Sequence, residues 1–99
     1  MLKYKVDQSV HGKMIEIVEH IHEESGIDVS DRFFRAFKDF LSTISSFPRK
    51  GKRVEFYDES MELRKLSLPK PFGKFVVYWV VYDDFAHITH VRHRSCECQ

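Results

Sequence analysis

The segment from Lys74 to Tyr82, KFVVYWVVY, is the most strand-prone stretch of the sequence. Valine, tyrosine, phenylalanine and tryptophan all favour strands, and the run is too uniformly apolar for a strand with one face in water. We therefore predict that it forms the central strand of a sheet. Asp83-Asp84 supplies a turn, and Ala86 to His93 returns as the final strand, so the two strands form a hairpin.

Helical periodicity appears upstream of this hairpin. Apolar residues recur at i, i+3, i+4 and i+7, which predicts a helix from about residue 10 to 24. Ser9 is its expected N-cap, and Ser25-Gly26 its expected end. The recurring residues are Met14, Ile17, Val18 and Ile21.

A second apolar stripe predicts another helix over about residues 31 to 46, after a short connection that contains Asp28 and Ser30 as alternative caps. Pro48 ends this element. Such a stripe usually faces a protein core rather than a cofactor, and the short connection predicts an antiparallel helical hairpin. The stripe consists of Phe33, Phe34, Phe37, Phe40, Leu41, Ile44 and Phe47.

The remaining segments read as strands and loops. Leu2 to Val6 alternates apolar and polar residues, as a half-buried strand does. After the second helix come a basic loop at Arg49 to Arg53, a short extended piece at Val54 to Tyr57, and a strand at Leu63 to Leu68. The order β-α-α-β-β-β predicts an α+β fold in which the helical hairpin packs on a twisted antiparallel sheet.

Length and charge limit the possible functions. The 99 residues suffice for one domain, which we expect to span residues 1–95, with residues 96–99 as a short C-terminal tail. The net charge is +1, so the whole chain lacks the basic excess that is typical of free-standing nucleic-acid binders. The first 48 residues carry 6 basic and 8 acidic side chains, whereas the rest carry 10 and 7. An anionic partner should therefore contact the C-terminal half.

The sequence predicts a cytoplasmic protein. It contains neither a membrane-spanning apolar run nor a signal-peptide core after Met1. Cys96 and Cys98 lie so close together that a disulfide would close no useful loop, which favours free thiols.

The order of elements and several phrases resemble the RelE/ParE superfamily of bacterial toxins from type II toxin–antitoxin systems. The resemblance is carried mostly by the helix that ends in Ser-Phe-Pro and by the final strand that runs into a basic turn. Within the superfamily the sequence is more similar to ParE toxins, also called plasmid stabilisation proteins. The phrases are Ile17 to Ser25, Ser30 to Pro48, Leu63 to Leu66, Lys74 to Asp83 and Ile88 to Arg94.

The resemblance implies a function and two partners. ParE-like toxins are non-nucleolytic and poison DNA gyrase, whereas RelE-like toxins cut messenger RNA in the ribosomal A site. Either kind is neutralised by a cognate antitoxin, whose disordered tail folds onto the toxin. We expect a ParE-like toxin without a cofactor or metal ion, with an mRNA endonuclease and an inactive antitoxin-binding member as alternatives.

Three departures from RelE favour the ParE-like interpretation. Phe75 stands where the RelE central strand carries an arginine, so one cation of a phosphate clamp is missing. Arg94 matches the arginine after the final strand, but Gln99 precedes the position of the RelE catalytic tyrosine. RelE relatives also tend to be strongly basic, and this chain is nearly neutral.

Histidines keep a reduced ribonuclease hypothesis open. His90, His93 and Arg94 are close in sequence, and some superfamily ribonucleases use a C-terminal histidine, which exchanges protons near neutral pH. The alternative is that both histidines are ordinary strand and turn residues. With Cys96 and Cys98 the histidines also give H-x2-H-x2-C-x-C, but this spacing suits zinc poorly, and a frayed terminus is favoured.

The resemblance and the charge pattern suggest two binding surfaces. Contacts to the target are expected from Arg64, Arg92, His93 and Arg94, on the later strands and the basic C-terminal turn. The antitoxin is expected in a groove between the helical hairpin and the sheet, lined by Phe34, Phe37 and Trp79. The loop from Arg49 to Arg53 is either a positive patch for an acidic partner or a solvated turn.

Overall fold

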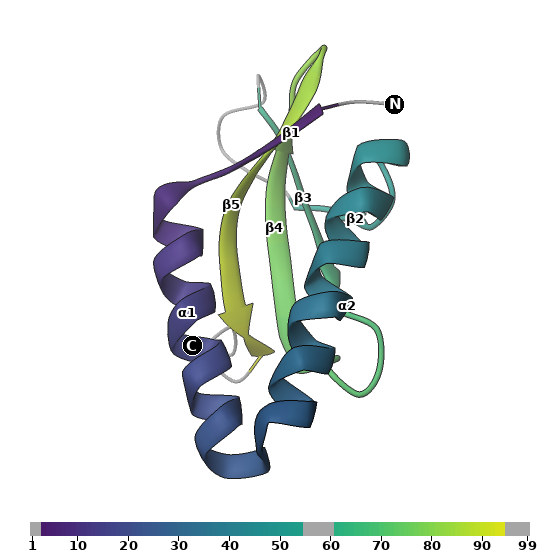
Figure 1. Cartoon of the computed structure of the whole chain (residues 1–99). Coiled ribbons are helices and arrows are strands. Elements are labelled where there is room, and N and C mark those ends of the chain that lie inside the picture. The colour runs from purple at the N-terminus through teal and green to yellow at the C-terminus, as the bar shows by residue number, and fades with distance from the viewer. Residues whose placement is uncertain (1–2, 55–60, 95–99) are drawn as a thin grey trace.

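The structure is a computed structural model that describes residues 3–54 and 61–94 (Figure 1). Strand β4 (Phe75–Val81) lies in the middle of a five-stranded sheet with the order β1-β5-β4-β3-β2. It pairs antiparallel with β5 (Phe85–His93) on one side and with β3 (Glu62–Ser67) on the other. The predicted central strand and the predicted final hairpin are therefore confirmed.

The two outer strands are short. Strand β1 (Lys3–Val6) runs parallel to β5, and β2 (Lys52–Arg53) runs antiparallel to β3. The sheet is thus mixed, whereas the sequence suggested pairing that is antiparallel throughout. Between β1 and β5 lie both helices and three strands, so no tight turn forces these two strands to run in opposite directions.

The strand expected at Val54 to Tyr57 begins earlier than predicted. Strand β2 falls inside the predicted basic loop, and the backbone N–H of Val54 extends its ladder with a 2.8 Å bond to the Leu63 carbonyl. Residues 55–57 lie outside the described part of the chain, as do residues 95–99 with both cysteines.

The helices meet at a single glycine. Helix α1 (Gln8–Ser25) begins after Asp7, whose carboxylate accepts from the backbone N–H of Ser9 at 3.0 Å, so Asp7 and not Ser9 is the N-cap. Gly26, with φ of +89°, ends α1 and begins α2 (Ile27–Ser46).

The predicted connection at residues 27–30 is therefore wrong. A glycine reverses the chain within one residue, and the first turn of α2 follows directly. Neither Asp28 nor Ser30 acts as the cap: both lie inside α2, and the Ser30 hydroxyl donates to the Ile27 carbonyl at 2.9 Å.

Both helices cover the same face of the sheet, with α1 alongside β5 (Figure 1). Most of the predicted stripe on α2 is buried against the sheet, and Trp79 on β4 and Phe33 on α2 are completely buried. Two members of the stripe are exceptions, because Phe34 and Phe47 are 49% and 64% exposed. The core lies between this single layer of helices and the sheet.

Register divides the strand residues between two faces, because side chains alternate along a strand. Val77, Trp79 and Val81 on β4 face the helices and belong to the core. Val76 and Val80 are also buried, but they lie on the opposite face, outside the core cluster. This second face, called the open face below, carries Lys3, Lys5, Lys52, Leu63, Lys65, Ser67, Val76, Tyr78, Val80, Phe85, His87, His90 and Arg92.

Candidate functional surfaces

The open face is basic. Within the described strands it carries five lysine or arginine side chains and no carboxylate, because the one acidic strand residue, Glu62, pairs with Val81 on the helix-facing side. Aromatic rings lie among the cations: Lys5 Nζ sits 4.9 Å from the centre of the Phe85 ring, and Tyr82 stacks on Phe85 at 4.6 Å. Lys52, Lys65 and Arg92 from the C-terminal half share this face with Lys3 and Lys5 from the N-terminal strand.

Arg94, directly after the end of β5, also lies on the open face. Its guanidinium donates to the Ser67 hydroxyl at 3.0 Å, and the two residues line a hollow of about 310 Å³ together with Lys52 and Lys65. Lys52 and Lys65 are direct cross-strand neighbours. Like charges in that position repel each other, so the hollow attracts anions.

Arg64 lies on the other face, in a compensated ion cluster. Its Nε donates to Glu62 at 2.7 Å, and Arg49 Nε lies 3.3 Å from the same carboxylate. The hydrogen bond from Arg64, aided by both arginine charges, holds the pKa of Glu62 below its usual range. Arg64 also donates to the backbone carbonyls of Arg49 and Gly51, so its contacts within the fold tie β3 to the loop before β2.

The two predicted histidines fall on opposite faces. His90 pairs with Tyr78 on the open face, with ring centres 6.2 Å apart, whereas His93 packs edge-on against Phe75 on the helix side at 5.4 Å. The two histidines are three residues apart in the regular part of β5 after the bulge near Thr89, so strand alternation separates them. Partial burial, aided by the charge of Arg92, lowers the pKa of His90. His90, His93 and Arg94 therefore do not converge on one reacting group.

The three residues expected to line an antitoxin groove also separate. Phe37 and Trp79 are 5% and 0% exposed and belong to the core, whereas Phe34 lies on the outer side of α2, with Lys38 Nζ 5.6 Å from its ring centre. Helical periodicity identified Phe34 and Phe37 as stripe residues, and strand propensity identified Trp79. Neither signal could show which of the three side chains would remain accessible.

A groove between α1 and the sheet does exist, with other residues. Its volume is about 540 Å³, and its apolar floor is formed by Ile17 and Ile21 of α1 and Phe75 of β4. Charged and polar side chains line it as well: Lys13, Glu16, His20, Glu24, Lys74 and His93. We call this the helix–sheet groove. His93 is the one predicted site residue that lines it.

A sheet edge continues from this groove. Strand β1 pairs with β5 only as far as Ile88, whose carbonyl accepts from the Asp7 N–H at 2.9 Å. Beyond that point, no described strand pairs with the outer edge of Thr89–His93. A hollow of about 370 Å³ lies here between β5 and the first turns of α1, and it shares Lys13 and His93 with the groove. The alternation of apolar and polar residues in β1 predicted a strand, but it did not show that β1 would leave the second half of β5 unpaired on this edge.

The described residues contain neither a candidate metal site nor a candidate membrane helix. Among residues 3–54 and 61–94, no three histidine, cysteine or acidic side chains are placed to hold a metal ion together. The cysteines of the zinc hypothesis lie outside these ranges. Neither described helix combines the length and apolar character needed to cross a membrane.

The fold belongs to a definite class, in which a helical hairpin covers one face of a mixed sheet. A solved structure described as "Chromosomal ParDE TA system from P. aeruginosa" contains a chain with this fold. The TM-score is 0.74 at 13% identity, over 94% of this chain and 96% of that one. The fold predicted from the resemblance to RelE/ParE toxins is confirmed. No protein-family model matches the sequence, and neither does any curated protein.

Proposed function

We propose that this chain is a ParE-like toxin of a type II toxin–antitoxin system, which inhibits its target by binding it. The likeness of fold to a chain of the ParDE structure, across nearly the whole length of both, is the observation that carries the proposal. DNA gyrase as the target follows from the sequence resemblance alone. The proposed target contacts are Arg92 and Arg94 on the basic side of the sheet, with Arg64 and His93 as further contacts from the helix side.

The proposed antitoxin seat is the helix–sheet groove together with the free edge of β5. An amphipathic helix would place its apolar side chains on Ile17, Ile21 and Phe75 and its charged ones at Lys13, Glu16 and Lys74. A strand of the same partner would pair with the backbone of Thr89–His93. Both modes suit a disordered tail that folds on binding, and Phe34 offers an additional contact on α2.

Pulse-labelling tests the toxin proposal. The chain is induced in a bacterial host, and DNA and protein synthesis are followed over the first minutes. We expect DNA synthesis to fall first, with a DNA-damage response, and we expect co-expression of the protein encoded beside the toxin gene to restore growth. Unimpaired synthesis of both kinds would reduce the proposal to an inactive antitoxin-binding member.

A ribosome-dependent mRNA endonuclease is the second candidate. The observation in its favour is the hollow formed by Lys52, Lys65 and Arg94, which would attract a phosphate. It ranks second because His90 and His93 face opposite sides of the sheet, so the two cannot share the proton transfers that cleavage requires. Protein synthesis failing before DNA synthesis would favour this candidate instead.

A further inference from the structure

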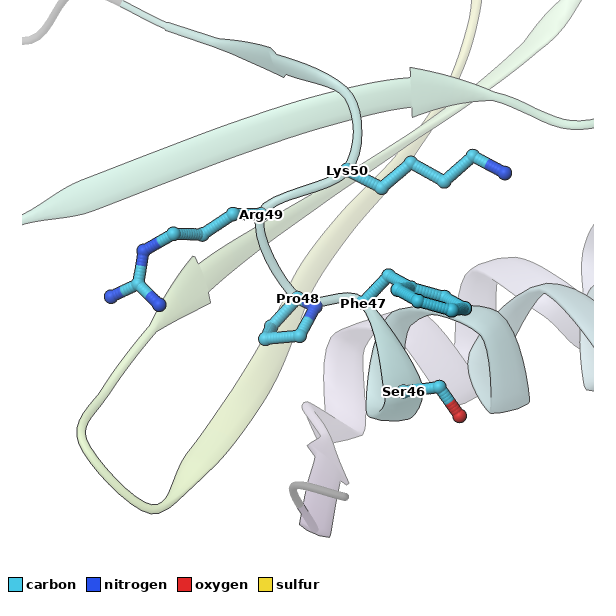
Figure 2. A pocket seen from close by; sticks show the side chains of 5 residues that line it. All are labelled: Ser46, Phe47, Pro48, Arg49 and Lys50. Atoms are coloured by element: carbon cyan, nitrogen blue, oxygen red, sulfur yellow. The ribbon is translucent and has the colours of Figure 1, made fainter.

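The turn after α2 displays an exposed aromatic ring beside a lysine. Phe47 is 64% exposed, and its backbone, with φ of −133° and ψ of 70°, leaves the helical conformation directly after Ser46. Figure 2 shows Phe47 and Lys50 extending to the same side of the turn, while Arg49 extends to the other. These residues, with Ser46 and Pro48, line a shallow hollow of about 520 Å³. We call this surface the Phe47–Lys50 turn.

The turn is held in one conformation by the core. The backbone N–H of Lys50 donates to the Phe47 carbonyl at 3.0 Å, and Trp79 Nε1 donates to the Pro48 carbonyl at 2.8 Å. Arg64 Nη1 donates to the Arg49 carbonyl at 2.9 Å. Binding at such a preformed surface loses little conformational entropy.

The charge of this turn is only partly compensated. Four of the five residues from Arg49 to Arg53 are cationic. Within the described residues, Arg49 lies against Glu62, a carboxylate that it shares with Arg64, whereas no carboxylate is in ion-pair range of Lys50. Lys50 therefore presents its charge to the solvent on the same side as the Phe47 ring.

We propose that the Phe47–Lys50 turn docks an acidic segment of a partner protein that carries a large apolar side chain. The apolar side chain packs on Phe47 and Pro48, and flanking carboxylates pair with Lys50. Charge complementarity selects an acidic partner, and a protein segment fits better than a nucleic acid because this surface presents one ring rather than the row of rings on which successive bases stack.

This surface is separate from the proposed antitoxin seat. The turn leads into β2 at one edge of the sheet, whereas the helix–sheet groove and the free part of β5 lie toward the other edge, beside α1. The inference therefore does not depend on the proposed function. It would hold for a toxin, a ribonuclease or an inactive member.

The single tryptophan of the chain gives a direct test. Its indole N–H donates to Pro48, so the one indole signal in a ¹⁵N-correlated NMR spectrum of the full chain reports on the turn. The probe is a blocked peptide of glutamates and aspartates around a central Leu-Phe pair. Two control peptides replace the Leu-Phe pair by Gly-Gly, or the acidic residues by lysine. We expect saturable shifts of the indole signal and of the amides of residues 46–51 with the first peptide alone.

Matched variants localise the binding. Phe47→Ala and Lys50→Glu should each raise the dissociation constant of the acidic peptide roughly tenfold, a typical effect for a central contact. Ile27→Ala and Lys70→Glu change a similarly exposed apolar residue and an exposed lysine elsewhere and should leave it unchanged. Absent shifts, equal effects of both variant pairs, or tighter binding of a single-stranded oligonucleotide than of the peptide would each overturn the proposal.

Discussion

The indole Nε1–H of Trp79 donates a 2.8 Å hydrogen bond to the backbone carbonyl of Pro48. Trp79 is fully buried in the middle of the central strand, and Pro48 lies in the turn after α2. The bond therefore satisfies the one polar atom of the largest core side chain and also fixes the exit of the helical hairpin. Core packing and the shape of a surface turn depend on the same residue.

Trp79→Phe should destabilise the fold through both effects. The smaller ring leaves space opposite Phe40, whose ring centre lies 6.0 Å from that of Trp79, and the Pro48 carbonyl loses its donor. We expect the free energy of unfolding to fall by about 2–4 kcal/mol. Urea unfolding followed by circular dichroism measures this loss. A loss below about 1 kcal/mol, the scale of one hydrogen bond, would show that the core refills the space.

Glu62→Gln should destabilise the protein more at neutral than at acidic pH. Arg64 lowers the pKa of Glu62 in the folded state, so the ionised carboxylate stabilises the fold above its unfolded pKa of about 4.3. That contribution is lost as the pH falls through the lower, folded-state pKa. Because the cluster is partly exposed, the loss at pH 7 should be only about 1 kcal/mol.

Urea unfolding at pH 7 and at pH 3 compares the wild type with this variant. Glu19→Gln, at an exposed position on α1, is the control and should change stability little at either pH. If the difference between wild type and Glu62→Gln were the same at both pH values, the ion cluster would not be its cause.

Two glycine substitutions should have opposite signs. Gly51 has φ of +92°, and an added Cβ would lie 2.6 Å from the Lys65 carbonyl oxygen, so Gly51→Ala should destabilise the fold by about 1–3 kcal/mol. Gly12 lies inside α1, where an added Cβ meets no atom within 4 Å. Gly12→Ala should therefore stabilise it by about 0.5–1 kcal/mol. Thermal unfolding of both variants tests the pair, and a destabilising Gly12→Ala would contradict this account.

The sequence predicted the fold well because its signals are local. The KFVVYWVVY run and the apolar stripes reflect burial, which periodicity reports directly, and they identified β4 and both helices. Two errors arose where one residue decides the geometry. Gly26 serves both helices, which removes the expected connection, and Asp7 takes the capping role expected of Ser9. Strand direction at β1 depends on tertiary contacts, so no local pattern predicted it.

The candidate sites were less predictable than the fold, because they depend on which face of the sheet each side chain lies on. A bulge next to Thr89 places Ile88 and His90 on opposite faces, although they are two residues apart. Arg64 was expected on a target surface, yet its hydrogen bonds run to Glu62 and to two backbone carbonyls. The helix–sheet groove combines residues from α1, β4 and β5, and no single stretch of sequence shows such a combination.

If the proposed function holds, Ile21→Glu should weaken the complex with the proposed antitoxin. Ile21 lines the helix–sheet groove, and a carboxylate there would oppose the apolar face of a docked helix. Titration calorimetry with the protein encoded by the neighbouring gene should show a loss of binding free energy of about 2 kcal/mol or more. Ile15→Glu is the control, because Ile15 is 60% exposed on the same helix and does not line the groove. Equal losses in both variants would place the antitoxin elsewhere on the molecule.

Arg94→Ala should reduce the growth arrest expected from the proposed function without unfolding the chain. Arg94 lies next to Ser67 and contributes to the basic hollow beside Lys52 and Lys65, so its removal weakens the attraction for an acidic or phosphate-bearing target. Lys38→Ala removes an equal charge from α2, away from this hollow, and should leave the arrest unchanged.

Growth after induction is compared between these variants and the wild type at matched protein levels. Circular dichroism confirms that each variant folds, and antitoxin binding shows whether that surface is intact. If folded Arg94→Ala arrested growth as strongly as the wild type, the target would bind outside the basic hollow.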